Sequence, residues 1–469
     1  MLTKEHITDL KNGNLQELYH CLQEQTDARR LLEILEHLGH LPKTFNPEIL
    51  LPLLEHSNSQ VRFWTVKNIG KVSNLALLDA LFNKATRDQD SMVRREAVSS
   101  IGRMRIKQAQ PYLIKLLNDN DPKIVLQAIR GLLVFRNEIT VKHELRQLMN
   151  HPNEMVQSVI HREFRQDIEK NKNVKSMPHV LSPQYMRNIV VMGDVLEILK
   201  YVQDESIHLT FTSPPYYNAR DYSIYESYQA YLDFLTDVFK AIHRITKEGR
   251  FLIVNTSPVI VPRVSRAHAS KRYPIPFDLH TRLVSNGWEF IDDIIWLKPE
   301  SSVKNRNAGF LQHRKPLAYK PNAVTEYLMV YRKESDKLLD WNMHQYEWNI
   351  IEESKVMGNY ETTNVWHIDP TFDRVHSAVF PIELCNRVIS YYSYKDDLVF
   401  DPFGGSGTFG KAARKLGRYF FLTEIEKLYI ERMKQDLMGK DMFTNLETSF
   451  LTIEEYKQLS KEYSHEINR

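Results

Sequence analysis

The chain has little cysteine and no long uncharged hydrophobic run. Only two cysteines, Cys21 and Cys385, occur in 469 residues, which excludes a disulfide framework and a zinc site built on paired cysteines. No apolar stretch is long enough to span a bilayer, and residues 1–6 lack the apolar core of a secretory signal. We therefore expect free thiols, no membrane partner, no metal site and a cytoplasmic location.

A strong charge of one sign is also absent. The 62 Lys and Arg residues against 59 Asp and Glu residues give a net charge of only +3, so a nucleic-acid partner has to be inferred from local patches. Charged residues make up 26% and hydrophobic residues 42% of the chain, which is typical of a globular protein. A chain of this length is too long for one typical core and predicts two domains.

The first third of the chain shows an internal repeat with a period of about 32 residues, over residues 56–166. Each copy follows a polar turn whose Asn, Asp and Pro residues cap or end helices. The matching apolar positions of the first two copies are Val61, Val66, Ile69, Val93, Val98 and Ile101. This pattern resembles HEAT-like repeats, so we expect an all-α HEAT-like solenoid over residues 1–165, in which residues before about 45 form a cap.

A basic cluster lies within the repeats and comprises Arg94, Arg95, Arg103, Arg105 and Lys107. These cations have the charge needed to contact phosphates. A solvated helix face is the favoured alternative, because charges on exposed helices are ordinary. The repeats also suit a protein partner or an additional contact with a nucleic acid.

Apolar strand patterns alternate with amphipathic helices after a polar linker at residues 166–185. This alternation predicts an α/β domain over residues 186–450, with a sheet covered on both faces and a helical tail at residues 451–469. The expected strands lie at residues 188–192, 207–210, 249–255, 290–296, 397–400 and 419–423.

One strand leads directly into the loop Thr212-Ser213-Pro214-Pro215-Tyr216. Both prolines have a fixed φ and no N–H, so the carbonyl groups of Ser213 and Pro214 have no local donor. The aromatic ring that follows offers a flat face. The combination suits a planar base that carries an exocyclic amine, with oxygens accepting from the NH2 group and Tyr216 stacking on the ring.

A second loop, residues 401–408 with the sequence DPFGGSGT, follows a later strand. Its glycines allow close backbone approach to a ligand. A phosphate is disfavoured as that ligand because no Lys-Ser or Lys-Thr pair follows the glycines.

Together the two loops resemble those of amino-group DNA methyltransferases that use S-adenosylmethionine. The order of the loops is similar to that of the β class. The resemblance covers roughly residues 185–440 and implies a class I methyltransferase fold with a mixed, mostly parallel sheet. It also implies transfer of a methyl group to a flipped base in double-stranded DNA, in restriction-modification or phage defence. In that setting the helical repeats are expected to bind a separate restriction endonuclease or another protein partner, or to extend the DNA footprint.

The resemblance implies a role for particular residues. The catalytic residues are Ser213, Pro214, Pro215 and Tyr216. The cofactor-binding residues are Asp194, Thr212, Phe380, Pro381, Asp401, Phe403, Gly404, Gly405, Gly407, Thr408 and Glu424. Among these, Asp401 is expected to pair with the cofactor's ammonium group and Glu424 with its ribose hydroxyls, whereas Asp194 suits either the adenine or the N-cap of the next helix.

A basic loop at residues 298–320 follows the fourth expected strand of this domain. Counterion release by such a loop contributes to binding a phosphate backbone, and the alternative is that its cations are only solvated. The expected DNA-binding residues are Lys298, Lys304, Arg306, Arg314, Lys315 and Lys320. The resemblance places a target-recognition region at about residues 335–375.

The residue at position 213 bears on the choice of base. Serine in place of aspartate implies N4 of cytosine as the methyl acceptor, and N6 of adenine is the alternative. A function of another class is also open, in which the repeats make the protein an adaptor and the methyltransferase fold is not catalytic.

Overall fold

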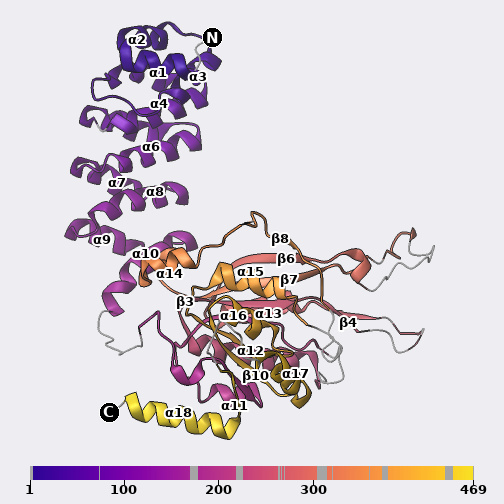
Figure 1. Cartoon of the computed structure of the whole chain (residues 1–469). Coiled ribbons are helices and arrows are strands. Elements are labelled where there is room, and N and C mark those ends of the chain that lie inside the picture. Colours follow the sequence, from indigo (N-terminus) through magenta and orange to yellow (C-terminus); the bar gives the residue numbers. More distant parts are fainter. Residues whose placement is uncertain are drawn as a thin grey trace. The chain divides into compact units, whose positions relative to one another are not determined.

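A computed structural model describes residues 4–72, 74–169, 178–217, 225–261, 265, 267–268, 270–303, 314–319, 321–358, 360–371, 379–438 and 447–467. The chain divides into two units, Met1–Asn173 and Val174–Arg469 (Figure 1). The division falls inside the linker expected from the sequence. Each unit is described by itself. No described helix is long and apolar enough to cross a membrane.

The first unit is helical throughout the part that the structure describes, and its helices follow one another as stacked pairs (Figure 1). Their bounds are α1 Lys4–Gly13, α2 Leu15–Glu24, α3 Ala28–His37, η1 Pro47–Glu55, α4 Ser59–Val72, α5 Leu78–Arg87, α6 Ser91–Arg103, α7 Gln110–Leu116, α8 Pro122–Leu132, α9 Ile139–Gln147 and α10 Glu154–Glu169. The second helix of each expected repeat is confirmed as α4, α6, α8 or α10. The turn residues act as predicted, since Asp90 and Asp121 cap α6 and α8.

Ion pairs join neighbouring repeats. Arg62 pairs with Asp88 at 2.8 Å and Arg95 pairs with Asp121 at 2.8 Å, so an arginine of one repeat contacts the turn that opens the next. Four of the five residues of the basic cluster have acidic partners within the unit: Arg94 with Asp119, Arg95 with Asp121, Lys107 with Glu138, and Arg103 with Glu96 of the same helix. Most of this cluster therefore serves contacts within the unit.

The second unit is built on a nine-stranded sheet with the order β11-β1-β10-β9-β2-β3-β7-β6-β8. Among the described strands of this sheet, β7 alone runs antiparallel to its neighbours, which confirms the mostly parallel sheet. The bounds are β1 Ile189–Met192, β2 Ile207–Thr212, β3 Thr246–Thr256, β6 Trp288–Leu297, β7 Thr325–Lys333, β8 Val365–His367, β9 Leu398–Asp401, β10 Tyr419–Glu424 and β11 Ser449–Thr452. A separate hairpin pairs β4 Val259–Val261 with β5 Lys271–Tyr273.

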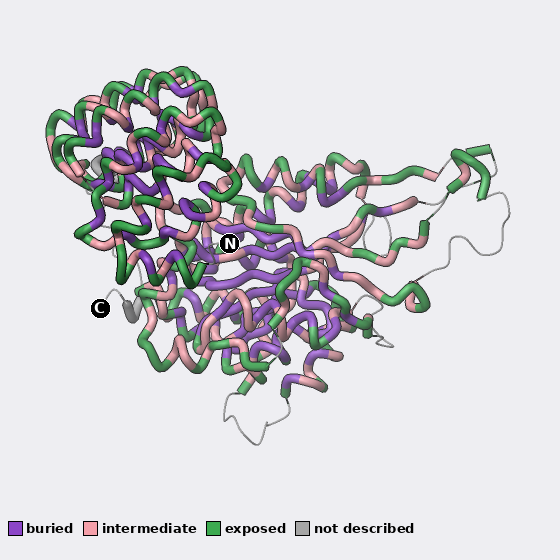
Figure 2. Tube along the Cα trace, turned by 90° about the horizontal axis from the view of Figure 1, so that it is seen from above, coloured by how far each residue is buried: buried purple, intermediate pink, exposed green. Residues whose placement is uncertain are grey.

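Helices cover both faces of this sheet. Alternate residues of a strand point to opposite faces, so Leu252 and Val254 pack in one core and Ile253 in the other. The first core includes residues of α11 Val195–Leu199, α12 Tyr228–Ile245, α13 Ile275–Ser285 and α18 Ile453–Ile467; the second includes residues of α15 Ile382–Tyr392, α16 Thr408–Lys415 and α17 Lys427–Leu437. The strands therefore form a nearly continuous buried band, purple in Figure 2.

The last described segment is part of this unit. β11 pairs with β1 in parallel at the edge of the sheet, and α18 buries Tyr456 in the first core. The limit expected at residue 450 falls within β11. The segment after residue 450 thus extends both the sheet and its helical cover.

Candidate active site

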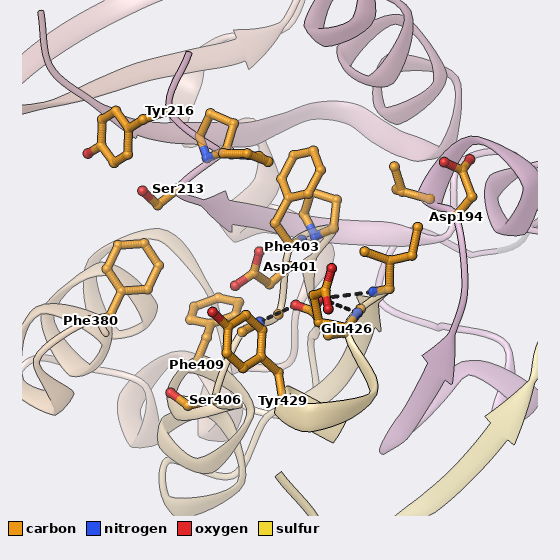
Figure 3. Close-up of a pocket in the computed structure, with 18 of the residues that line it drawn as sticks. Asp194, Ser213, Tyr216, Phe380, Asp401, Phe403, Ser406, Phe409, Glu426 and Tyr429 are labelled. Carbon is orange, nitrogen blue, oxygen red and sulfur yellow. Dashed lines mark hydrogen bonds between the residues drawn. The ribbon is translucent and has the colours of Figure 1, made fainter. Parts of the chain in front are cut away.

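Two loops that are far apart in sequence meet at one edge of the sheet. β2 and β9 are parallel neighbours, so their carboxyl ends, Thr212 and Asp401, lie at the same edge. Thr212 Oγ1 donates a hydrogen bond of 2.7 Å to Asp401 Oδ1. The loops that follow these two residues line a single cavity of about 240 Å³ (Figure 3).

Most of the site residues named from the sequence line this cavity. They are Asp194, Ser213, Pro214, Pro215, Tyr216, Phe380, Asp401, Phe403, Gly404, Gly405, Thr408 and Glu424. Thr212, Pro381 and Gly407 are outside the lining; Thr212 is fully buried and supports Asp401 from below. Figure 3 shows Ser213 and Tyr216 together at one end and Asp194 at the other.

Asp401 is a buried carboxyl group that lacks a cationic partner in the described chain. It is 2% exposed, and its Oδ1 accepts from Thr212 Oγ1 and from the Phe403 N–H at 3.0 Å. Burial raises the pKa of Asp401 to about 7, although these two hydrogen bonds lower it. Among the described residues Oδ2 has no hydrogen-bond partner, and an ammonium group of a ligand is the kind of donor that it fits.

Glu424, at the end of β10, holds three backbone groups. Its Oε2 accepts from Gly405 N at 2.8 Å, and its Oε1 accepts from Ile425 N at 2.9 Å and Glu426 N at 2.8 Å. Burial raises the pKa of Glu424, and these hydrogen bonds lower it. An ionised carboxylate has about four acceptor positions, so capacity for one ligand hydroxyl remains.

The glycine-rich loop passes close to α17. Gly407 begins α16 at a φ of 80°, and a Cβ at this position would lie 2.9 Å from Met433 Cγ. Only glycine adopts this conformation without strain. Gly407 therefore shapes the loop from behind, whereas Gly404 and Gly405 lie on the cavity side.

The loop at residues 213–216 is anchored by its side chains. The Tyr216 hydroxyl donates to Glu326 Oε2 at 3.1 Å, and Asn255 Nδ2 lies 3.5 Å from Ser213 Oγ. Burial and the nearby Glu326 raise the pKa of Tyr216 well above its ordinary value. The phenol therefore stays protonated and acts as a donor.

Asp194 combines two of its expected features. Its Oδ1 accepts from Leu196 N at 2.9 Å and from Glu197 N at 3.1 Å, which makes it the N-cap of α11. It also lines the cavity. The N-cap expectation is confirmed, and a contact with an adenine stays a prediction.

Several lining residues were not named from the sequence, among them Phe234, Glu426 and Tyr429. Tyr429 lies in the first turn of α17, five positions after Glu424, and this closeness to a named residue is the signal that could have found it. Tyr225 lines the cavity and packs against Tyr217 and Tyr231.

The expected DNA-binding residues are only partly described. Lys298 forms an ion pair with Glu326 and lies 4.2 Å from the centre of the Trp296 ring. Arg314 and Lys315 are exposed. Lys304, Arg306 and Lys320 lie outside the described residues.

Comparisons with known proteins match both units. A family described as DNA methylase matches residues 207–435, and one described as HEAT repeats matches residues 46–133. The chain is 27% identical over 288 residues to the type II methyltransferase M.MwoI of Methanothermobacter wolfeii, covering 59% of this chain and 37% of that protein. It is 28% identical over 282 residues to the type II methyltransferase M.Cfr9I of Citrobacter freundii, covering 53% and 87%.

Some of these relatives are much longer than the region they share with this chain. The chain spans 37% of the length of M.MwoI and 28% of the length of the type II beta methyltransferase M.BslI of a Bacillus species. Among solved structures, a putative DNA modification methylase from Thermus thermophilus matches 57% of this chain and 99% of its own, with 24% identity and a TM-score of 0.44. The PvuII DNA methyltransferase (cytosine-N4-specific) matches 61% and 97%, with 17% identity and a TM-score of 0.41.

Proposed function

We propose that this protein is a site-specific DNA methyltransferase. The premise is that residues 207–435 match the DNA methylase family and residues 46–133 match HEAT repeats. The observation that carries the proposal is the cavity shared by Ser213 and Asp401, whose loops are joined by the hydrogen bond from Thr212. The substrate is double-stranded DNA and the cofactor is S-adenosylmethionine. The expected setting is restriction-modification or phage defence, with any endonuclease a separate protein.

The cavity residues fit this cofactor. Asp401 Oδ2 would pair with the ammonium group of its amino-acid end, and Glu424 would accept from a ribose hydroxyl. Asp194 and Phe403 would border the adenine, and the backbone of Gly404 and Gly405 would allow close approach. When bound, S-adenosylmethionine supplies an electrophilic methyl group on a sulfonium centre.

The catalytic loop acts on the exocyclic amine of a flipped base. The lone pair of this amine is delocalised into the ring, which makes it a poor nucleophile. Ser213 and the Pro214 carbonyl would accept hydrogen bonds from NH2, which concentrates the lone pair on nitrogen and orients it. The Tyr216 ring would stack on the base and hold it out of the duplex.

The proposed acceptor is N4 of cytosine. Serine at position 213 supports this choice through the resemblance of the loop to SPPY sequences, and N6 of adenine is the alternative. The exposed cations Arg314 and Lys315, with Lys304, Arg306 and Lys320, are proposed to contact phosphates. Lys298 is already paired with Glu326, so its proposed role is to hold Glu326 and not to contact a phosphate. Residues 335–375 are the proposed target-recognition region.

Nucleoside analysis tests the proposal. Purified full-length protein is incubated with unmodified genomic DNA and isotopically labelled S-adenosylmethionine, and the digested DNA is analysed by mass spectrometry. We expect labelled N4-methylcytosine. Labelled N6-methyladenine alone would make the choice of base wrong and leave the reaction class standing.

Two variants separate catalysis from cofactor binding. Tyr216→Ala removes a base–aromatic stack worth about 1–3 kcal/mol, so turnover should fall by about 5- to 150-fold, and Ser213→Ala should also lose turnover. Both should bind S-adenosylmethionine within about twofold of wild type. Full activity in both would refute the assigned roles. Binding of a protein partner with no methyl transfer to any nucleic acid would favour the adaptor function.

A further inference from the structure

Three side chains from three neighbouring strands meet beneath the catalytic loop. β7 is antiparallel to β3 and β6, so its first residues lie beside the last residues of both neighbours. This places Glu326 of β7 next to Asn255 of β3 and next to Lys298, which directly follows β6. The antiparallel strand thus brings a carboxylate to the edge where the parallel strands present the catalytic loop.

Glu326 has a donor from each of these segments. Its Oε2 accepts from Tyr216 Oη at 3.1 Å and from Asn255 Nδ2 at 2.6 Å, and its Oε1 is ion-paired with Lys298 Nζ. The Glu326 side chain is only 16% exposed. Charge-assisted hydrogen bonds in such a shielded place are stronger than neutral ones, so Glu326 fixes the Tyr216 hydroxyl.

Asn255 extends this contact to the serine. A carboxylate only accepts hydrogen bonds, so the Asn255 amide must turn its NH2 group toward Glu326. The same NH2 group lies 3.5 Å from Ser213 Oγ. The other end of the amide, Oδ1, is buried and has no hydrogen-bond partner among the described residues, which means that the orientation of Asn255 depends on Glu326.

We propose that Glu326 is a positioning residue for the methyl transfer: it holds Tyr216 directly and Ser213 through Asn255, and Lys298 balances its charge. The proposal rests on the proposed function. The loop contains two prolines and has few N–H groups for backbone hydrogen bonds, so side-chain anchors determine its geometry. A displacement of about 1 Å in such a loop can lower the rate by about 100-fold.

A matched control lies on the same two strands. Glu289, near the start of β6, is 3.8 Å from Arg332, near the end of β7. This ion pair also joins β6 to β7, but at the opposite edge of the sheet from the cavity. If a loss of turnover came only from weaker pairing of β6 with β7, it would be equally large in Glu289→Gln and Glu326→Gln.

The first experiment measures turnover in the full chain. Glu326→Ala should lower kcat on unmodified genomic DNA by at least about tenfold, while the Kd for S-adenosylmethionine stays within about twofold. Glu326→Gln keeps an acceptor oxygen and should recover part of that loss, and Glu289→Gln should match wild type. The double variant Tyr216→Phe with Glu326→Ala should be no slower than the slower single variant, because both substitutions remove the same hydrogen bond between Tyr216 and Glu326. Wild-type turnover in Glu326→Ala, or fully additive losses, would overturn the proposal.

The second experiment does not depend on catalysis. 3-Fluorotyrosine is placed at position 216 and its ¹⁹F resonance is followed with pH. Glu326→Gln should shift this resonance and let the fluorophenol ionise at lower pH, because a neighbouring negative charge is removed; Glu289→Gln should not. An unchanged resonance in Glu326→Gln would overturn the contact. If the resonance moves but the wild-type protein transfers no methyl group, the contact stands and the proposed function, with the catalytic role of Glu326, falls.

Discussion

The carboxyl group of Asp401 has a pKa of about 7 because it is buried, and a buried carboxylate is costly until a cation pairs with it. Thr212 and the Phe403 N–H stabilise the charge only in part. In the free protein the group is therefore about half protonated near neutral pH. The proposed pairing of Asp401 with the cofactor's ammonium group requires the ionised form, so cofactor binding would be coupled to release of a proton.

This coupling predicts a pH dependence of cofactor affinity. Below pH 7 the carboxyl must lose its proton to bind, so affinity should rise about tenfold per pH unit up to about pH 7 and then level off. It should fall again where the cofactor's own amino group loses its proton. Titration calorimetry between pH 5 and 9, in buffers of different ionisation heat, measures both affinity and proton release.

Asp401→Asn is the control for this prediction. The amide cannot ionise, so the variant should bind S-adenosylmethionine more weakly and lose the rise below pH 7. A wild-type affinity that is flat from pH 5 to 7 would contradict the raised pKa.

At the residue scale, the sequence predicted those cavity residues that belong to short local motifs. Ser213 and Asp401 were identified because each lies in a short loop of distinctive composition directly after a strand. Glu326 was not, since it is 110 positions from Tyr216 and no unusual neighbour marks it. The role proposed for it rests on the antiparallel pairing of β7 with β3 and β6, which local sequence patterns do not reveal.

At the scale of elements, the apolar runs predicted six strands of the sheet because strands buried on both faces are nearly continuous in apolar residues. β7, β8 and β11 were not predicted; β8 and β11 are edge strands of only three and four residues. The segment η1 Pro47–Glu55 is a 3-10 helix with Pro52 inside it. Proline removes the donor that an α-helix needs at that position.

Helix contacts in the repeats depend on small residues, which gives a prediction at this scale. A Cβ added at Gly131 in α8 would lie 2.9 Å from Gly102 Cα in α6 and 2.9 Å from Leu113 Cδ1. The Gly102 backbone can move away only at a cost in free energy, so Gly131→Ala should lower the free energy of unfolding of this unit by about 1–3 kcal/mol. Chemical denaturation followed by far-UV circular dichroism measures the change.

Gly13→Ala is the matched control, because a Cβ at Gly13 in α1 meets nothing within 4 Å. It should change the unfolding free energy by no more than about 0.5 kcal/mol. Equal effects of the two substitutions would show that close packing of α6 on α8 does not stabilise the repeats.

At the scale of the whole molecule, each unit has its own core. The core of the first unit is formed by residues between Ile7 and Phe164, and the two cores of the second unit by residues between Tyr185 and Tyr456. Both loops of the cavity, Glu326 and its donors belong to the second unit. Burial of an independent core is what lets a domain fold alone.

Separation of the units should therefore preserve the cavity. A fragment of residues 174–469 should bind S-adenosylmethionine with a Kd within about threefold of the full chain, because every residue that lines the cavity is present. A fragment of residues 1–173 should show a helical spectrum and a cooperative thermal transition of its own. Calorimetry of the first fragment and circular dichroism of both are the measurements. If residues 174–469 were unfolded alone, or folded without cofactor binding, the repeats would be needed to form the cavity, and the site would have to be assigned to the whole chain.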